Sequence, residues 1–127
     1  MTENELAKRA VDVAFHLHTT LGPGLLESVY QEVYTAKLRE GGLEVETEVE
    51  LPVVFEGTRY HSTFRADLIV GKKLIIELKS VESVLPVHKK QLLTYLRLTG
   101  LRLGLLINFG APTIKAGIER IINGNLE

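Results

Sequence analysis

The chain has 127 residues, of which 45% are hydrophobic and 24% charged, so it suits one globular domain over residues 1–127 rather than a disordered segment. It contains no cysteine, which excludes disulfides, thiolate zinc sites and a cysteine nucleophile. No apolar run approaches the roughly 20 residues that span a bilayer, and the acidic first five residues lack a signal-peptide core. We therefore expect no membrane association and a cytoplasmic location.

The net charge of −1 conceals an uneven distribution of charged residues along the chain. Residues 1–56 hold 4 basic and 11 acidic side chains, whereas residues 57–102 hold 9 basic and 3 acidic ones. The basic middle segment suits an anionic partner such as nucleic acid. Ordinary solvated surface explains the charge count equally well.

Two helices are expected first. Apolar residues at helical spacing predict one helix over about residues 3–20 and a second over about residues 25–40. Gly22-Pro23-Gly24 ends the first helix, and Gly41-Gly42 ends the second in the manner of a C-terminal cap.

Alternation of side-chain type then replaces the helical pattern. From Glu44 to Leu51, four glutamates interleave with Val, Thr and Leu residues, which predicts a half-buried strand. The glutamates invite a metal-site interpretation, but a solvent-facing strand whose charges discourage edge pairing explains them better. Further strands, joined by turns at residues 56–57 and 71–72, are expected over Val53–Glu56, Arg59–Val70 and Lys73–Lys79.

The last third of the chain is expected to begin with a helix over about residues 87–99. Arg102–Asn108 follows as a leucine-rich strand, and regularly spaced isoleucines predict a short last helix over about residues 113–122. A helix between two strands implies a right-handed crossover, so Arg102–Asn108 should lie parallel to Lys73–Lys79. The predicted fold class is α/β (α+β), with a central mixed sheet of four to five strands flanked by helices.

Alternation along two neighbouring strands predicts that three charged side chains meet. In the strand Lys73–Lys79, Glu77 and Lys79 share one face, and the other face is fully apolar. Asp67 occupies the corresponding face of the preceding strand, and a two-residue hairpin makes the strands neighbours. Asp67 and Glu77 should therefore converge on one side of the sheet.

Two adjacent carboxylates repel each other, and their burial is costly unless they are paired or bind a cation. Oxygen ligands favour Mg²⁺ or Mn²⁺ over zinc. Lys79 could orient a water or neutralise charge that develops on a phosphate. The alternative is a structural salt bridge between Lys79 and one of the carboxylates, which spacing alone favours.

Several motifs carry a resemblance to a known family. The order Asp67…Glu77-Leu78-Lys79 on adjoining strands, followed by a helix, resembles the PD-(D/E)XK nuclease superfamily, whose fold is restriction-endonuclease-like. Gly24-Leu25-Leu26-Glu27-Ser28-Val29-Tyr30 is similar to the motif that names its GxxExxY family. Residues 76–79, 91–96 and 104–110 also resemble that family. The likeness covers about residues 5–122, and separated motifs in the right order favour a nuclease-type site.

The resemblance implies a role for each residue of the strand motif. Asp67 and Glu77 would hold a divalent metal ion, Mg²⁺ or Mn²⁺, with the backbone carbonyl of Leu78 as a further oxygen ligand. Lys79 would position or activate the attacking water.

Two helical residues complete the set that the resemblance implies. Glu27 would bind the metal directly or through water, although a carboxylate in a first helical turn is also favoured by the helix dipole. Gln91 would contact the phosphate or the water. It shares a helical face with His88 and Tyr95, and that face either lines the site or is polar surface. Tyr30 is expected to be a packing residue with a hydrogen-bonded hydroxyl.

Two features depart from the pattern of a nuclease that grips duplex DNA. Ala66 stands where the superfamily name has proline, which is a tolerated position. The isoelectric point near 6.4 is low for a protein that contacts many phosphates. Either the basic segment is concentrated on one face, or a homodimer joins two basic surfaces, or the substrate is small.

The expected function is metal-dependent hydrolysis of a phosphodiester in nucleic acid, with DNA as the expected substrate. One alternative is a non-catalytic nucleic-acid- or protein-binding module that retains the nuclease fold. Another is a nuclease subunit that acts only with a protein partner. The presence of every site residue argues against a decayed site, because such a site has no reason to keep a costly carboxylate cluster.

Overall fold

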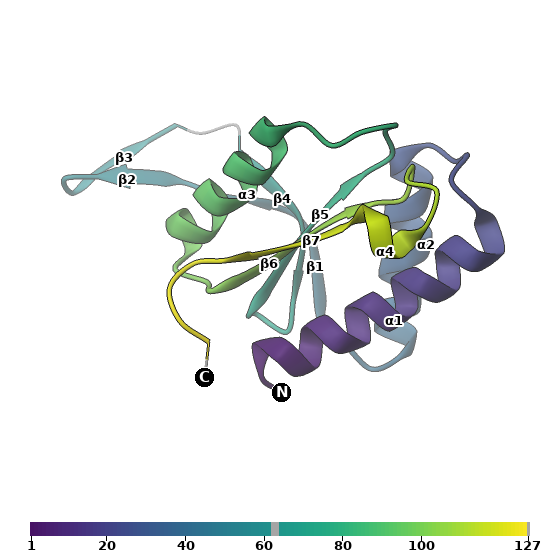
Figure 1. Ribbon diagram of the computed structural model, residues 1–127. Coiled ribbons are helices and arrows are strands. Elements are labelled where there is room, and N and C mark those ends of the chain that lie inside the picture. The colour runs from purple at the N-terminus through teal and green to yellow at the C-terminus, as the bar shows by residue number, and fades with distance from the viewer. Residues whose placement is uncertain (62–63, 127) are drawn as a thin grey trace.

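The computed structural model describes residues 1–61 and 64–126 (Figure 1). The chain begins with helices α1 (Glu3–Leu21) and α2 (Glu27–Glu40). The strands that follow are β1 (Val45–Glu50), β2 (Val53–Phe55), β3 (Thr58–Tyr60), β4 (Arg65–Val70) and β5 (Leu74–Lys79). The last elements are α3 (Pro86–Thr99), β6 (Leu103–Asn108), α4 (Ile114–Gly117) and β7 (Ile118–Ile122). Among these helices, none has the length and apolarity needed to cross a bilayer.

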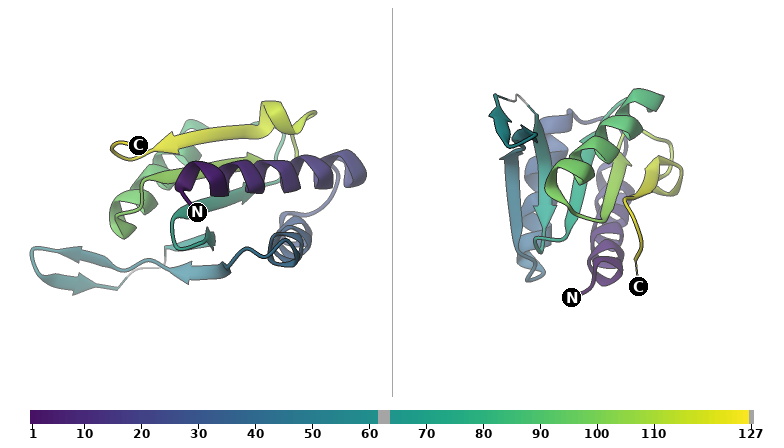
Figure 2. Two further views of the ribbon diagram at one scale, coloured as in Figure 1. Left: turned by 90° about the horizontal axis from the view of Figure 1, so that it is seen from below. Right: turned by 90° about the vertical axis from the view of Figure 1, so that its left-hand side faces the viewer.

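Five strands form the main sheet in the order β1-β4-β5-β6-β7, and β2 and β3 form a separate two-stranded ribbon. Strands β5 and β6 are parallel, as predicted, and the other neighbours in the main sheet are antiparallel. Helices α1 and α2 lie on one face and α3 on the other (Figures 1 and 2). The predicted fold class, a mixed sheet of four to five strands flanked by helices, is confirmed.

Two hydrophobic cores lie on opposite faces of this sheet. The larger one packs α1 and α2 against the face that carries Leu74, Ile76 and Leu78. The smaller one packs α3 against the face that carries Ile69 and Ile75. The alternation therefore predicted the faces of β5 correctly, and residues 67, 77 and 79 belong to the α3 face.

Tight turns set the register of both hairpins. Glu56 and Gly57 connect β2 to β3, and Gly71 and Lys72 connect β4 to β5. All four residues have positive φ, at 50°, 78°, 59° and 59°. Two successive residues in the left-handed region are typical of a type I′ turn, whose twist matches that of the flanking strands.

The two turns lie where they were predicted, but the two-residue hairpin between β4 and β5 is wrong. Lys73 adds a third residue to this connection, so Val70 pairs with Leu74. A two-residue connection would place Asp67 opposite Ile76, whereas the observed register places it opposite Glu77.

The C-terminal segment differs from the predicted helix over residues 113–122. The helix spans only Ile114–Gly117, and Ile118–Ile122 forms β7, which pairs antiparallel with β6. The isoleucines fit helical spacing, but β-branched residues also favour a strand. Without β7, strand β6 would present a long apolar edge with unpaired backbone groups. Pairing along that edge overrides the local spacing.

The predicted continuous strand Arg59–Val70 is also wrong. Strand β3 ends at Tyr60 and pairs with β2, whereas β4 begins at Arg65 and belongs to the main sheet. Residues 62 and 63 lie outside the described part of the chain. The break separates the ribbon from the main sheet, and Figure 2 shows the ribbon extending away from the end of β1.

Gly110 provides a test of the packing between β6 and the segment after β5. A Cβ at residue 110 would lie 2.6 Å from the backbone nitrogen of Val81, which cannot move aside as a flexible side chain can. We expect Gly110→Ala to lower the free energy of unfolding by about 3 kcal/mol and Tm by roughly 10 °C. Thermal denaturation followed by circular dichroism measures this change.

The matched control is Gly24→Ala, since a Cβ at residue 24 meets nothing within 4 Å. Its Tm should stay within about 2 °C of the wild-type value. Equal melting temperatures for both variants would contradict the close approach of Gly110 to Val81.

Candidate active site

Asp67 and Glu77 lie opposite each other on β4 and β5, where the backbone ladder between these strands ends. The last paired residues are Leu68 and Ile76, so Asp67 and Glu77 occupy the next position of the register. Each carboxylate accepts a backbone N–H from the other strand. Asp67 N donates to Glu77 Oε1, and Leu78 N donates to Asp67 Oδ2, both at 2.8 Å. The predicted convergence of the two carboxylates is confirmed.

The carboxylate pair is enclosed and carries uncompensated negative charge. Glu77 is only 6% exposed, and Asp67 is half-buried. Burial raises the pKa of both carboxyl groups, and the charge of Asp67 adds to the effect of burial to raise the pKa of Glu77 to about 8. The two backbone N–H donors lower these pKa values without cancelling the rise. A bound cation would relieve the cost of holding both groups ionised.

Lys79 lies at the end of β5 on the same face as Glu77 and is half-buried. Its positive charge lowers the pKa of both carboxyl groups, so it lies near them. It makes no ion pair with either. The ion pairs of residues 1–61 and 64–126 are Lys37–Glu40, Lys72–Glu44 and Lys89–Glu119. The alternative of a structural salt bridge at Lys79 is therefore wrong for the described residues.

Asn108, the buried last residue of β6, holds the chain that follows Lys79. Its side-chain Oδ1 accepts the N–H groups of Val81 and Gly110, each at 3.0 Å, and its Nδ2 donates to the Val81 carbonyl at 2.8 Å. The Lys79 carbonyl accepts the N–H of Phe109 at 2.9 Å. These bonds fix the end of β5, so the Lys79 side chain extends from a held backbone.

Glu27 is the first residue of α2, and its negative charge raises the pKa of Asp67. The structure therefore brings Glu27 near the carboxylate pair, as the resemblance implied. The approach of α2 to the site is fixed by Ser80, which directly follows β5. Ser80 Oγ donates to the carbonyl of Leu25 at 2.7 Å. This bond ties the start of α2 to the strand that carries Glu77.

Tyr30 shapes the loop before α2. Its fully buried ring stacks on Phe109 with 4.6 Å between ring centroids. Its hydroxyl accepts the N–H of Leu25 at 3.1 Å and donates to the carbonyl of Gly22. The expected packing role with a hydrogen-bonded hydroxyl is confirmed. It explains the spacing of the motif, because Tyr30 fixes the loop from which the helix with Glu27 begins.

Helix α3 brings Tyr95, and not His88, to the carboxylates. Tyr95 is 4% exposed, and burial together with the charges of the two carboxylates raises its pKa to about 12. His88 instead accepts the N–H of Leu85 through Nδ1 at 3.1 Å, at the start of the helix. Gln91 lies one turn before Tyr95 and is half-buried, and its side chain makes no hydrogen bond with the described residues. Its role in binding phosphate or water stays a prediction.

Glu48 is a neighbour of the site that the sequence pattern did not single out. The register of β1 and β4 places it across from Asp67, and its charge raises the pKa of that residue. Its φ of 49° lies in the left-handed region, which a strand residue other than glycine rarely adopts. Its Oε1 accepts a hydrogen bond from Nε2 of Gln31, with 2.8 Å between the two atoms. The glutamates of β1 are exposed, as predicted, but this one also borders the site.

The donors at the site suit a hard divalent cation. Asp67 and Glu77 supply carboxylate oxygens. The Leu78 N–H points toward β4, and the N–H and C=O of a strand residue point the same way, so the Leu78 carbonyl is directed there too. In the described part of the chain, no three acidic or histidine side chains already form a metal-binding cluster. Glu27 and Glu48 therefore stand further from the pair and suit contacts through water.

Glu77→Gln tests whether the pair stores electrostatic strain. In the folded protein without metal, the pKa of Glu77 is about 8 against an ordinary 4.5, so the folded state binds a proton that the unfolded state releases. Stability is then highest below pH 4.5 and falls as pH rises toward 8. Glutamine keeps the acceptor oxygen but has no charge. We expect it to remove this fall, which is on the order of 2 kcal/mol.

The measurement is the melting temperature of both proteins in a chelator across pH 5–8.5. Glu46→Gln is the matched control, because Glu46 is an exposed residue of β1 and its charge does not act on the pair. Equal pH slopes for the wild type and Glu77→Gln would show that Glu77 is not strained.

Comparison with known proteins agrees with this geometry. No curated protein and no solved structure gives a significant match to the chain. A family model described as the PD-(D/E)XK nuclease superfamily matches residues 4–121, which include every residue of the candidate site. The chain therefore belongs to the PD-(D/E)XK nuclease superfamily.

Proposed function

We propose that this protein is a nuclease that hydrolyses phosphodiester bonds in DNA and depends on Mg²⁺ or Mn²⁺. The observation that carries the proposal is the buried pair of Asp67 and Glu77 with Lys79 beside it, since Lys79 makes no ion pair with the described residues. Membership of a nuclease superfamily supports the reaction class. The DNA substrate and the metal requirement are parts of the proposal.

Asp67, Glu77 and the Leu78 carbonyl would hold the cation, with Glu27 and Glu48 acting through water. A divalent cation supplies Lewis acidity to a phosphoryl oxygen and makes a bound water easier to ionise. The residues of the chain provide the positioning. Because each carboxylate already accepts a backbone N–H, its orientation is fixed before any ligand binds.

Lys79 would place its ammonium group beside the phosphate and stabilise the negative charge that develops there. The Tyr95 hydroxyl, which keeps its proton at neutral pH, can donate a hydrogen bond from the α3 side. Gln91 would contact the phosphate or the water from the same helix. These groups surround the carboxylates without neutralising them, which suits binding of a cation and a phosphate together.

The finer assignments follow from the same residues. We place the chain in the GxxExxY branch because Gly24 to Tyr30 carry its motif and Tyr30 fixes the loop before Glu27. We take residues 1–127 as one nuclease domain. The lack of cysteine suits a reducing cytoplasm, where we place the activity. The low isoelectric point favours help in binding DNA from a second copy of the chain or from a protein partner.

Lys79→Ala is the direct test of catalysis. We expect cleavage to fall by at least about 100-fold, because charge stabilisation at the reacting phosphate is lost. The fold should be retained, since Lys79 makes no ion pair with the described residues. The assay is nicking of supercoiled plasmid, with linear DNA, branched DNA and RNA as further substrates, in Mg²⁺ or Mn²⁺.

Lys73→Ala is the matched control, because Lys73 directly precedes β5, is exposed and makes its hydrogen bond to Met1 far from the site. It should cleave like the wild type. Equal cleavage by the wild type and Lys79→Ala would refute the site. No cleavage by the wild type on any substrate would favour a non-catalytic module or a partner-dependent subunit.

Asp67→Asn tests the metal ligands separately from turnover. We expect the affinity for Mn²⁺, measured by isothermal titration calorimetry, to fall roughly tenfold or more, because a charged oxygen donor is replaced by a neutral one. Glu46→Gln again serves as the control, since it removes one negative charge from an exposed position of β1. Unchanged affinity in Asp67→Asn would exclude Asp67 as a ligand.

A further inference from the structure

The β2–β3 ribbon, residues Val53–Tyr60, leaves the main sheet next to the candidate active site. It connects the end of β1 to the segment before β4, and these two strands carry Glu48 and Asp67 (Figure 1). Among the described residues, strands β2 and β3 pair only with each other. The ribbon therefore adds no strand to the main sheet.

The two faces of the ribbon differ in chemistry. The pairs Val53↔Tyr60 and Phe55↔Thr58 share one face, because opposite residues of paired strands point the same way. Phe55 and Tyr60 are 62% and 51% exposed, which is unusual for large aromatic rings in a globular protein. The remaining pair, Val54↔Arg59, lies on the other face.

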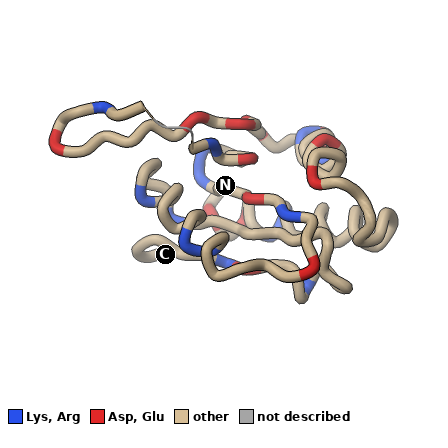
Figure 3. The backbone as a smooth tube through the Cα atoms, turned by 90° about the horizontal axis from the view of Figure 1, so that it is seen from above, with Lys and Arg blue, Asp and Glu red and all other residues tan. Residues whose placement is uncertain are grey.

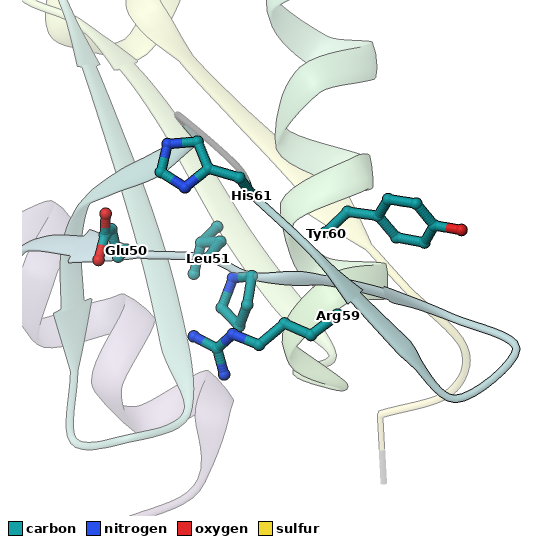
Figure 4. Close-up of a pocket in the computed structure, with 6 residues that line it drawn as sticks. Glu50, Leu51, Arg59, Tyr60 and His61 are labelled. Carbon is teal, nitrogen blue, oxygen red and sulfur yellow. The ribbon is translucent and has the colours of Figure 1, made fainter.

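A small hollow lies where the ribbon leaves the main sheet. Its lining residues are Glu50, Leu51, Pro52, Arg59, Tyr60 and His61. Figure 4 shows the Tyr60 ring pointing away from this hollow while the Arg59 side chain extends toward it. The Tyr60 ring is therefore presented outward.

The charge around the ribbon favours an anionic partner. Residues 53–65 include Arg59, His61 and Arg65 and one acidic residue, Glu56, at the turn of the ribbon. Neither arginine makes an ion pair or a side-chain hydrogen bond with the described residues. By contrast, glutamates occupy every second position along β1, before the start of the ribbon (Figure 3). Two unpaired cations beside exposed rings suit a phosphate chain that carries accessible bases.

An aromatic path connects the ribbon side of the site to the carboxylates. Phe64, just before β4, lies against Tyr95, with 5.8 Å between ring centroids and a tilt of 53°. The charges of the carboxylate pair reach Tyr95. Aromatic side chains thus lie both on the ribbon and at the site itself. Bases in a duplex are already stacked on each other, so exposed rings are of most use to unpaired bases.

We propose that the β2–β3 ribbon binds a single-stranded segment of the nucleic acid, with unpaired bases stacked on Phe55 and Tyr60 and phosphates beside Arg59 and Arg65. This inference rests on the proposed function for the identity of the ligand. It goes further in naming the form of the substrate, an unpaired strand next to the scissile bond. It also accounts for the low isoelectric point, since stacking needs fewer phosphate contacts than gripping a duplex does.

The test measures binding of the full chain by fluorescence anisotropy in the presence of a chelator. The labelled ligands are a 20-nucleotide single strand, an abasic strand of the same length and a duplex of the same length. Tyr60→Ala should weaken binding to the single strand about tenfold and leave the abasic strand within about twofold. Tyr60→Phe should keep most of the affinity because it keeps the ring. Val54→Ala is the matched control, since Val54 is 59% exposed on the opposite face.

Three results would overturn the ribbon proposal. One is an equal loss in Val54→Ala, or no loss in Tyr60→Ala. Another is tighter binding of duplex than of single strand by the wild type. The third is light scattering that shows a wild-type dimer and a Tyr60→Ala monomer, since the rings would then join two copies of the chain.

Hydrolysis of bis(p-nitrophenyl) phosphate in Mn²⁺ separates this proposal from the proposed function. That diester has no bases, so its cleavage by the wild type and not by Lys79→Ala tests the catalytic site alone. If the wild type does not hydrolyse this diester but still binds the single strand through Tyr60, the proposed function is refuted and the ribbon proposal stands. If the wild type hydrolyses the diester but its binding to the single strand does not depend on Tyr60, the ribbon proposal is refuted and the proposed function stands.

Discussion

The site depends on two carboxylates that accept backbone N–H groups at the point where the backbone hydrogen bonds between β4 and β5 end. Where β4 and β5 stop pairing, Asp67 and Glu77 each accept a backbone N–H from the opposite strand. The same bonds that join the strands also fix the direction in which the free oxygens point. A ligand set built this way needs no side-chain ordering when a cation binds, which lowers the entropic cost of binding.

Holding two like charges together is costly, and the rest of the fold supplies the stability that this requires. Strand β5 is buried on both faces, by α1 and α2 on one side and by α3 on the other. Its end is further held by the Asn108 side chain and by Ser80. Removing the charge of such a pair therefore relieves strain, and the presence of a costly group in a stable frame is typical of a functional site.

The sequence predicted those parts of the site that follow from the alternation of side chains along a strand and from the short connections between strands. Alternation placed Glu77 and Lys79 on one face of β5. The assumed two-residue hairpin was wrong, because Lys73 adds a third residue to the connection, and this register is what places Asp67 opposite Glu77. The sequence pattern predicted a helix in place of β7, because isoleucines at helical spacing also suit a strand that pairs with the free edge of β6. It did not distinguish Glu48 from the other glutamates of β1, since a backbone φ of 49° leaves no trace in an alternating pattern. Helical spacing grouped His88 with Tyr95 but could not tell which of them lies deep enough to reach the carboxylates.

The distribution of charge at the site determines whether a cation or a phosphate can bind first. Asp67, Glu27 and Glu48 give the site a negative potential, which attracts a cation and repels a phosphate, and Glu77 adds to it when it loses its proton. A phosphate can approach only after a cation has offset that potential, or from the side where positive charge lies. Lys79 supplies one such charge at the site, and Arg59 and Arg65 supply others toward the ribbon. If the ribbon binds a single strand as proposed, a strand that approaches past Arg59 and Arg65 meets exposed aromatic rings before it reaches the carboxylates.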